Sequence, residues 1–187
     1  MADTHREIEI KLPLAGAAQG RKLLRAAGFR VSRRRVFERN ALFDTAAGEL
    51  RRSRVGLRLR KCGSRAILTF KGPPRPGRHK DREELEIDLG DGRTFEQILA
   101  RLGYSPTFRY EKYRTEYARE RSTGRVMLDE TPVGVFLELE GSPGWIDRTA
   151  RALGFSESDY ITDSYASLHL RAHGGKLSDM VFGPGAS

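Results

Sequence analysis

The chain repeatedly alternates charged and apolar residues, and this period of two constrains its fold more than any other feature. Residues 7–12 read Glu-Ile-Glu-Ile-Lys-Leu, residues 57–60 read Leu-Arg-Leu-Arg, and residues 136–140 read Phe-Leu-Glu-Leu-Glu. Successive residues of a β-strand point to opposite faces, so each segment predicts a strand with one ionisable and one aliphatic face. The sequence therefore favours a sheet-based fold, with helices inserted between the strands.

Turn-forming residues divide this pattern into eight predicted strands. They cover residues 7–12, 31–43, 55–61, 66–71, 82–89, 107–118, 124–130 and 134–140. Amphipathic segments predict helices over about 16–27, 94–102, 143–153 and 159–172. We predict one α+β domain over residues 1–174, with the strands forming an eight-stranded antiparallel β-barrel or a strongly curved sheet and the helices packed outside. A flexible glycine-rich tail is expected at 175–187.

Composition excludes several classes of protein. No run approaches 18 apolar residues, so we expect no helix that spans a membrane. Residues 1–4 lack the basic and then apolar pattern of a secretory leader. Cys62 is the single cysteine, which permits no internal disulfide and no thiolate zinc site. A reducing cytoplasm is the simplest expected location.

Positive charge is concentrated in one part of the chain. Residues 19–82 hold 20 Lys and Arg against 4 Asp and Glu, whereas the whole chain has a net charge of +9. This asymmetry indicates an anionic partner, for which nucleic acid, phosphorylated small molecules and polyphosphate are all candidates. The tightest run, Arg33 to Arg35, is also typical of an ordinary solvated strand.

The ionisable faces permit two interpretations. Strand by strand, they match half-buried strands with a wet outer face. Helices, however, need an apolar sheet face to pack against, and if they cover the aliphatic face then the charged face lines the inside of the barrel. Enclosed charges are costly unless they pair with one another, bind metal or hold a charged ligand. Carboxylates suit Mg²⁺ or Mn²⁺, and convergent Arg and Lys suit phosphate oxygens.

Six further motifs follow the N-terminal Glu-x-Glu-x-Lys in order and in matching parity. They are Leu57-Arg58-Leu59-Arg60, Leu68-Thr69-Phe70-Lys71-Gly72-Pro73, Arg82-Glu83-Glu84-Leu85-Glu86, Lys112-Tyr113-Arg114, Leu128-Asp129 and Phe136-Leu137-Glu138-Leu139-Glu140. Together they resemble the CYTH family, the triphosphate tunnel metalloenzymes, over residues 6–170. The resemblance implies an eight-stranded antiparallel tunnel that binds a triphosphate together with a divalent metal.

The resemblance also implies residue roles. The metal, Mg²⁺ or Mn²⁺, would be held by Glu7, Glu9, Glu138 and Glu140, with Asp129 beside them. The phosphates would be bound by Lys11, Arg58, Arg60, Lys71 and Arg114, with Lys112 as an additional candidate. The interior carboxylates Glu84 and Glu86 would orient the cations or hold a second metal, and with Lys11 and Arg114 they form the expected catalytic set. Tyr165 would close the tunnel mouth. Arg171 and Lys176 are candidates for the basic residue that the family often has near its C-terminus.

Two reactions are compatible with such a site. Attack by water on a terminal phosphorus would make the protein a triphosphatase, and attack by the ribose 3′-hydroxyl on the α-phosphorus of ATP would make it an adenylyl cyclase of class IV type. The expected partner is a small-molecule triphosphate, namely ATP, inorganic triphosphate or thiamine triphosphate. Membranes are not expected as partners, nucleic acid is not favoured, and a homodimer is left open.

Two alternatives belong to other functional classes. One is a non-catalytic protein that binds polyphosphate or nucleic acid through the basic 19–82 segment, and the other is an inactive regulatory member of the same fold. No P-loop motif occurs in the sequence. We interpret His169 and His173 as a pair of surface histidines, Cys62 as an incidental thiol and Trp145 as a packing residue.

Overall fold

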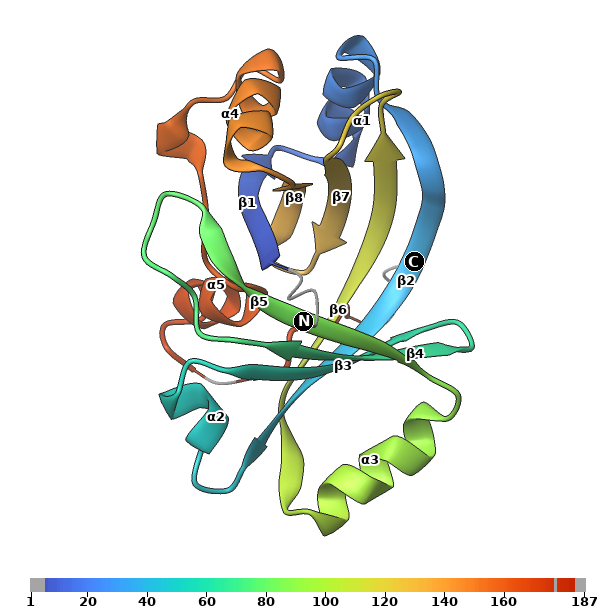
Figure 1. The fold of residues 1–187 in the computed structure, drawn as a ribbon, viewed down its shortest axis with the longest axis vertical. Helices are drawn as coiled ribbons and strands as arrows, with labels where there is room; N and C mark the ends of the chain where they lie inside the picture. The colour runs from blue at the N-terminus through green and yellow to red at the C-terminus, as the bar shows by residue number, and fades with distance from the viewer. Residues whose placement is uncertain (1–5, 177, 184–187) are drawn as a thin grey trace, which may run out of the picture.

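Eight antiparallel strands form a closed barrel in this computed structural model, which describes residues 6–176 and 178–183 (Figure 1). Around the barrel the strand order is β1-β5-β4-β3-β2-β6-β7-β8, and β8 returns to pair with β1. The strands are β1 (Arg6–Leu14), β2 (Arg30–Thr45), β3 (Gly56–Cys62), β4 (Arg65–Lys71), β5 (Lys80–Leu89), β6 (Tyr104–Ala118), β7 (Arg125–Thr131) and β8 (Gly134–Glu140). The predicted α+β barrel is therefore confirmed.

Five α-helices and one 3₁₀ turn accompany the strands. They are α1 (Ala17–Ala26), α2 (Glu49–Arg52), α3 (Gly92–Arg101), α4 (Pro143–Ala152), the 3₁₀ turn η1 (Glu157–Asp159) and α5 (Tyr165–Ala172). Helices α1, α2 and α3 lie between strands, and the others follow β8. In Figure 1, α1 and α4 lie at one end of the barrel and α3 at the other. The sequence analysis missed α2, a single turn that is too short to show a period.

The predicted helix at 159–172 was wrong in its first half. Ile161 instead exchanges two backbone hydrogen bonds with Lys11 of β1, at 2.8 and 2.9 Å. This bridge holds the chain extended, so α5 begins only at Tyr165, where the Ser164 hydroxyl caps it by accepting a hydrogen bond from the backbone N–H of Ser167. The bridge brings the start of α5 against the barrel wall.

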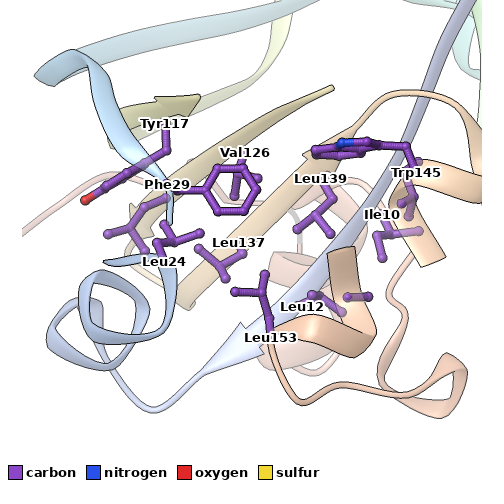
Figure 2. Packing of buried hydrophobic residues seen from close by; sticks show 13 residues of the cluster. Ile10, Leu12, Leu24, Phe29, Tyr117, Val126, Leu137, Leu139, Trp145 and Leu153 are labelled. Atoms are coloured by element: carbon purple, nitrogen blue, oxygen red, sulfur yellow. The ribbon is translucent and has the colours of Figure 1, made fainter. Parts of the chain in front are cut away.

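The aliphatic faces of the strands point outward, and helices cover most of them, although Leu85 and Ile87 of β5 stay exposed. Ile10, Leu12, Leu137 and Leu139 are fully buried, and they pack with residues of α1 and α4 in the largest apolar cluster (Figure 2). Each such side chain contributes about 1.5–3 kcal/mol when it leaves water. Trp145 belongs to the same cluster, which confirms it as a packing residue.

A second apolar cluster lies under α3 at the other end. Leu99 of that helix packs on Phe43 of β2 and Leu59 of β3. Because helices cover the aliphatic faces at both ends, the alternation directs the ionisable side chains into the barrel. The interior interpretation of the charged faces is therefore confirmed, and the solvated-face interpretation is wrong for these strands.

The segment 178–183 lies along β6, although we expected a flexible tail at 175–187. Met180 is fully buried, its N–H donates to the Arg109 carbonyl at 2.9 Å, and its carbonyl accepts from the N–H of Glu111 at 2.9 Å. The side chains of Met180 and Phe182, together with backbone and side-chain hydrogen bonds to Arg109 and Glu111, thus attach this segment to the barrel. Residue 177 and residues 184–187 of the expected tail lie outside the described residues. Among the helices of the described chain, none is long and apolar enough to cross a membrane.

Candidate active site

A cavity of about 470 Å³ occupies the interior of the barrel, and charged side chains make up most of its wall. The cations of the wall are Arg6, Lys11, Arg58, Arg60, Lys71, Lys80, Arg82, Lys112, Arg114 and Arg125. Its carboxylates are Glu7, Glu9, Glu84, Glu86, Glu116, Glu138 and Glu140. This cavity is lined by all the residues predicted to bind metal or phosphate, apart from Asp129.

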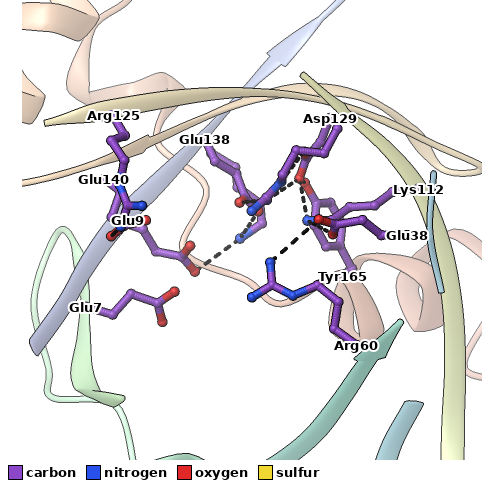
Figure 3. A network of polar contacts seen from close by, with 12 residues as sticks. Glu7, Glu9, Glu38, Arg60, Lys112, Arg125, Asp129, Glu138, Glu140 and Tyr165 are labelled. Carbon is purple, nitrogen blue, oxygen red and sulfur yellow. Dashed lines mark hydrogen bonds and ion pairs between the residues drawn. The ribbon is translucent and has the colours of Figure 1, made fainter. Parts of the chain in front are cut away.

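Strand register explains why the carboxylates of β1 and β8 meet. In the antiparallel pair, Glu9 lies directly opposite Glu140, and Lys11 lies directly opposite Glu138. Directly opposed residues have neighbouring side chains, so the Glu-x-Glu-x-Lys of β1 and the Glu-x-Glu of β8 form one continuous polar surface. Figure 3 shows Glu7, Glu9 and Glu138 pointing into the same interior space.

Lys11 joins the two strands electrostatically. Its ammonium is 3.4 Å from a carboxylate oxygen of Glu9 and 3.4 Å from one of Glu138, and the side chain is almost fully buried. Burial by itself would lower the pKa of Lys11, but the two carboxylates outweigh burial and hold the pKa well above its ordinary value. Lys11 therefore remains a permanent cation among the β1 and β8 carboxylates.

The carboxylate set fits a hard divalent cation in its chemistry. Burial, and then the negative charges of Glu7 and Glu9, raise the pKa of Glu140 in spite of its pairing with Arg125. A cation placed among these oxygens would relieve that repulsion. Within residues 6–176 and 178–183, however, no three acidic, histidine or cysteine side chains are gathered tightly enough to hold a metal as they stand. Each carboxylate is turned toward a lysine or arginine instead, so metal binding requires these side chains to rearrange.

A wall of cations from β3 and β4 faces the carboxylates of β1. Lys71 donates to Glu7 at 2.8 Å and to Glu84 at 2.9 Å, while Arg60 donates to Glu86 at 2.8 Å. Glu84 and Glu86 thus contact cations that project into the cavity. Burial, followed by the charge of Glu7, raises the pKa of Glu84 to about 7, although Lys71 opposes the shift.

Asp129 is not among the residues that line the cavity, although we expected it beside the metal ligands. It is fully buried and accepts hydrogen bonds from Lys112 at 2.8 Å, from Arg114 at 2.7 and 2.6 Å, and from the Tyr165 hydroxyl at 2.8 Å. These donors occupy both carboxylate oxygens. Asp129 therefore fixes two cations of the wall, and these donors separate its oxygens from the cavity (Figure 3).

Tyr165, the first residue of α5, forms part of the cavity wall. Its ring centroid is 5.1 Å from the Lys11 ammonium and 5.3 Å from the Lys112 ammonium, and only 6% of the residue is exposed. This contact depends on the Ile161 bridge that places α5 against the barrel. The tyrosine is thus a buried part of the cavity wall, and its closing of the tunnel mouth stays a prediction.

The structure adds cavity residues to which the sequence analysis gave no role. Lys80 and Arg82 share the parity of Glu84 on β5, so the alternation could have identified both. The Lys80 ammonium donates to Glu9 at 2.6 Å, and Arg82 donates to Glu7 at 3.1 Å. Burial, reinforced by neighbouring cations, lowers the pKa of Lys80 to about 8 in spite of Glu9.

Glu38 of β2 also escaped the sequence analysis, because it interrupts a basic segment and no motif marks it. It is 1% exposed, with Arg60 at 3.6 Å and Lys112 at 3.7 Å. Although burial alone would raise the pKa of Glu38, Lys112, Arg114 and the arginines of β3 lower it to about 2. It therefore supplies a permanent negative charge beneath the cation wall.

Other nominated residues lie away from the cavity. Arg171 pairs with Asp163 on the surface and Lys176 is exposed, so neither lines the cavity. The interpretation of His169 as a surface residue was wrong. It is 5% exposed, and its Nε2 is 2.9 Å from the Ser178 hydroxyl.

Two of the three arginines in the β2 run are paired within the chain, and the third, Arg34, is exposed. Arg33 contacts Glu116 at 3.1 Å, and Arg35 contacts Glu130 at 2.9 Å while its guanidinium lies 3.5 Å from the centroid of the Tyr113 ring. These glutamates already compensate the positive charge of Arg33 and Arg35, which would otherwise be available to bind the phosphates of a nucleic acid. The nucleic-acid interpretation therefore gains no support from this strand.

Comparison with known proteins identifies relatives with the same architecture. The CYTH domain family matches residues 5–165. A protein of Methanocaldococcus jannaschii named "putative adenylate cyclase" is 27% identical over 172 residues, which span 87% of this chain and 97% of that protein. A solved structure from Vibrio parahaemolyticus with the same name has a TM-score of 0.76 at 17% identity and covers 89% of this chain and 99% of its own.

A further solved structure carries a different activity in its description. It comes from Hippeastrum, is described as an adenylyl cyclase candidate that reveals a dominant triphosphatase activity, and has a TM-score of 0.63 at 20% identity. The match covers 91% of this chain and 97% of that one. At such identities the solved structures show a shared fold.

Proposed function

Since this chain belongs to the CYTH domain family, we propose that it is a divalent-metal-dependent enzyme that processes a triphosphate inside the barrel. One observation carries the proposal: carboxylates of β1 and β8 face cations of β3, β4 and β6 across a single cavity of about 470 Å³. Metal-bridged polyphosphate has both positive and negative faces, and it complements such a wall.

Glu7, Glu9, Glu138 and Glu140 would hold Mg²⁺ or Mn²⁺. When bound, the metal supplies Lewis acidity to a phosphate oxygen and neutralises charge that develops in the transition state. Phosphoryl transfer asks little covalent chemistry of the protein, so the remaining task is to position the phosphates and stabilise their charge.

The cations of the wall perform that task. Arg58 and Lys71 would donate to phosphate oxygens, with Glu84 and Glu86 fixing their directions. Arg114 and Lys112, held from behind by Asp129, would contact the phosphate chain from β6. Lys11 lies between the two groups and would contact the phosphate nearest the metal. These side chains are largely buried, and a charged contact in such surroundings is stronger than in bulk water.

Two reactions fit this arrangement. In the hydrolase reaction, water attacks the terminal phosphorus, the P–O bond to the bridging oxygen breaks, and the diphosphate leaves. The transferred phosphoryl group becomes orthophosphate, and a proton of the water passes to solvent. In the cyclase reaction, the ribose 3′-oxygen attacks the α-phosphorus of ATP, pyrophosphate leaves, and the 3′-hydroxyl proton passes to solvent. The relatives are named for both activities, and the substrates we propose are ATP, inorganic triphosphate and thiamine triphosphate, in a cytoplasmic setting.

Product analysis distinguishes these reactions. Purified protein would be incubated with ATP and Mg²⁺ or Mn²⁺, and the products resolved by phosphorus NMR. Cyclic AMP with pyrophosphate identifies a cyclase, whereas ADP with orthophosphate identifies a triphosphatase. Inorganic triphosphate and thiamine triphosphate are then assayed in the same way. If none of these substrates is turned over or bound with either metal, the proposal is refuted.

A further inference from the structure

Lys80 is a buried cation of the cavity that belongs to none of the motifs recognised in the sequence. It is the first residue of β5 and lies directly opposite Glu9 in the β1–β5 pair. Its ammonium is 2.6 Å from a Glu9 carboxylate oxygen, and both side chains are less than a tenth exposed. The shortest ion pair of Glu9, a proposed metal ligand, is therefore made with Lys80.

Glu9 is held by two ammonium groups that differ in their other contacts. Lys11 is shared between Glu9 and Glu138, whereas Lys80 has Glu9 as its one acidic partner within 4 Å among the described residues. Lys80 is thus the cation that can leave Glu9 with the smaller loss of other contacts.

The backbone beside Lys80 is fixed from outside the barrel. His79 Nε2 is 2.8 Å from a carboxylate oxygen of Asp147 on α4, and Arg78 contacts the other oxygen at 2.6 Å. The Tyr160 hydroxyl donates to the same carboxylate at 3.1 Å. Because the backbone is held there, the ammonium can leave Glu9 only by rotating its four-carbon stem, and that motion keeps it inside the cavity.

We propose that Lys80 is a positioning residue that couples metal binding to triphosphate binding. This inference rests on the proposed function. In the free protein Lys80 neutralises Glu9. Coordination of a divalent cation by Glu9 displaces the ammonium, since two cations on one carboxylate repel each other. The released ammonium then donates to a phosphate oxygen. The coupling is reciprocal: a phosphate that captures Lys80 frees Glu9 for the metal.

The first test measures the binding of Mn²⁺ to the full chain, without triphosphate, by electron paramagnetic resonance. Lys80→Met removes the charge and keeps a long apolar stem, so it should bind Mn²⁺ at least about fivefold more tightly than the wild type, the lower end of typical coupling factors. Lys80→Arg keeps the charge and should retain wild-type affinity. Lys61→Met is the matched control, because Lys61 pairs with Glu96 at the surface and should leave the affinity unchanged.

Calorimetric titration of inorganic triphosphate in EDTA provides the second test. Lys80→Met should weaken this binding relative to the wild type and to Lys61→Met. Unchanged triphosphate affinity would overturn the coupling, because Lys80 would then only repel metal. Unchanged or weaker Mn²⁺ binding by Lys80→Met would overturn the inference while leaving the proposed function in place, provided that Glu9→Gln loses Mn²⁺. If the wild type binds no Mn²⁺ at all, the proposed function and this inference both fail.

Discussion

Replacing Asp129 by alanine should destabilise the fold strongly, because this carboxylate compensates two buried cations. It accepts from Lys112 at 2.8 Å, from Arg114 at 2.7 and 2.6 Å, and from the Tyr165 hydroxyl at 2.8 Å, with none of its own surface exposed. Removal of one partner from a buried ion pair costs about 3–5 kcal/mol. Domains have a total unfolding free energy of about 5–15 kcal/mol, so the loss is a large share.

Urea denaturation followed by circular dichroism measures this loss. For a chain of this length each kcal/mol corresponds to about 2–4 °C in Tm, so a melting scan should show a decrease of about 6–20 °C. Asp88→Ala is the matched control. Asp88 pairs with Arg65 at 2.9 Å, but both side chains are more than half exposed, so its loss should cost no more than about 1 kcal/mol. If Asp129→Ala cost no more than this control, the buried network would be refuted.

Three further predictions concern ligand binding, pH and packing. Arg58→Ala should weaken triphosphate binding by about 1.5–3 kcal/mol, the contribution of a charge-assisted hydrogen bond, and an unchanged calorimetric affinity would show that this side chain does not reach the ligand. Burial and Glu7 raise the pKa of Glu84 from 4.5 to about 7, so the folded state binds this proton more tightly than the unfolded chain does. The resulting stabilisation is complete below pH 4.5 and is lost as the pH rises through about 7. Glu84→Gln should reduce this loss of stability. If the urea midpoints of the two proteins changed equally from pH 5 to 8, the raised pKa of Glu84 would be contradicted. Gly124→Ala should cost about 1–3 kcal/mol in the same denaturation assay, because a Cβ there would lie 2.4 Å from the Trp145 ring, and an unchanged midpoint would mean that the ring can shift freely.

The barrel and most of its wall could be predicted from the sequence because strand periodicity is a local property. Once the helices are assigned to the aliphatic face, the parity of each strand determines which side chains point inward, and Glu7, Arg58, Lys71 and Glu138 all follow this rule. The order of the motifs then supplied the chemistry. The register between neighbouring strands was not needed to predict most of the residues that line the cavity.

Features that depend on contacts between distant segments could not be predicted in this way. The break at Ile161 arises from a bridge to β1, which overrides a local helical pattern. Parity placed Asp129 inward but did not show that Lys112, Arg114 and Tyr165 occupy its oxygens, since that depends on the β6–β7 register and on α5. Register and tertiary contact thus decide which inward carboxylates face the cavity.

The central claim, that the β1 and β8 carboxylates hold a metal which processes a triphosphate, is tested most directly by comparing Glu138→Gln with the wild type in one phosphorus NMR time course. Both proteins would be given the substrate found to be turned over, with Mg²⁺ or Mn²⁺ and again with EDTA. We predict metal-dependent cleavage by the wild type, none in EDTA, and none by Glu138→Gln although its circular dichroism spectrum is native. Cleavage at the wild-type rate by Glu138→Gln, or in EDTA, would contradict the account.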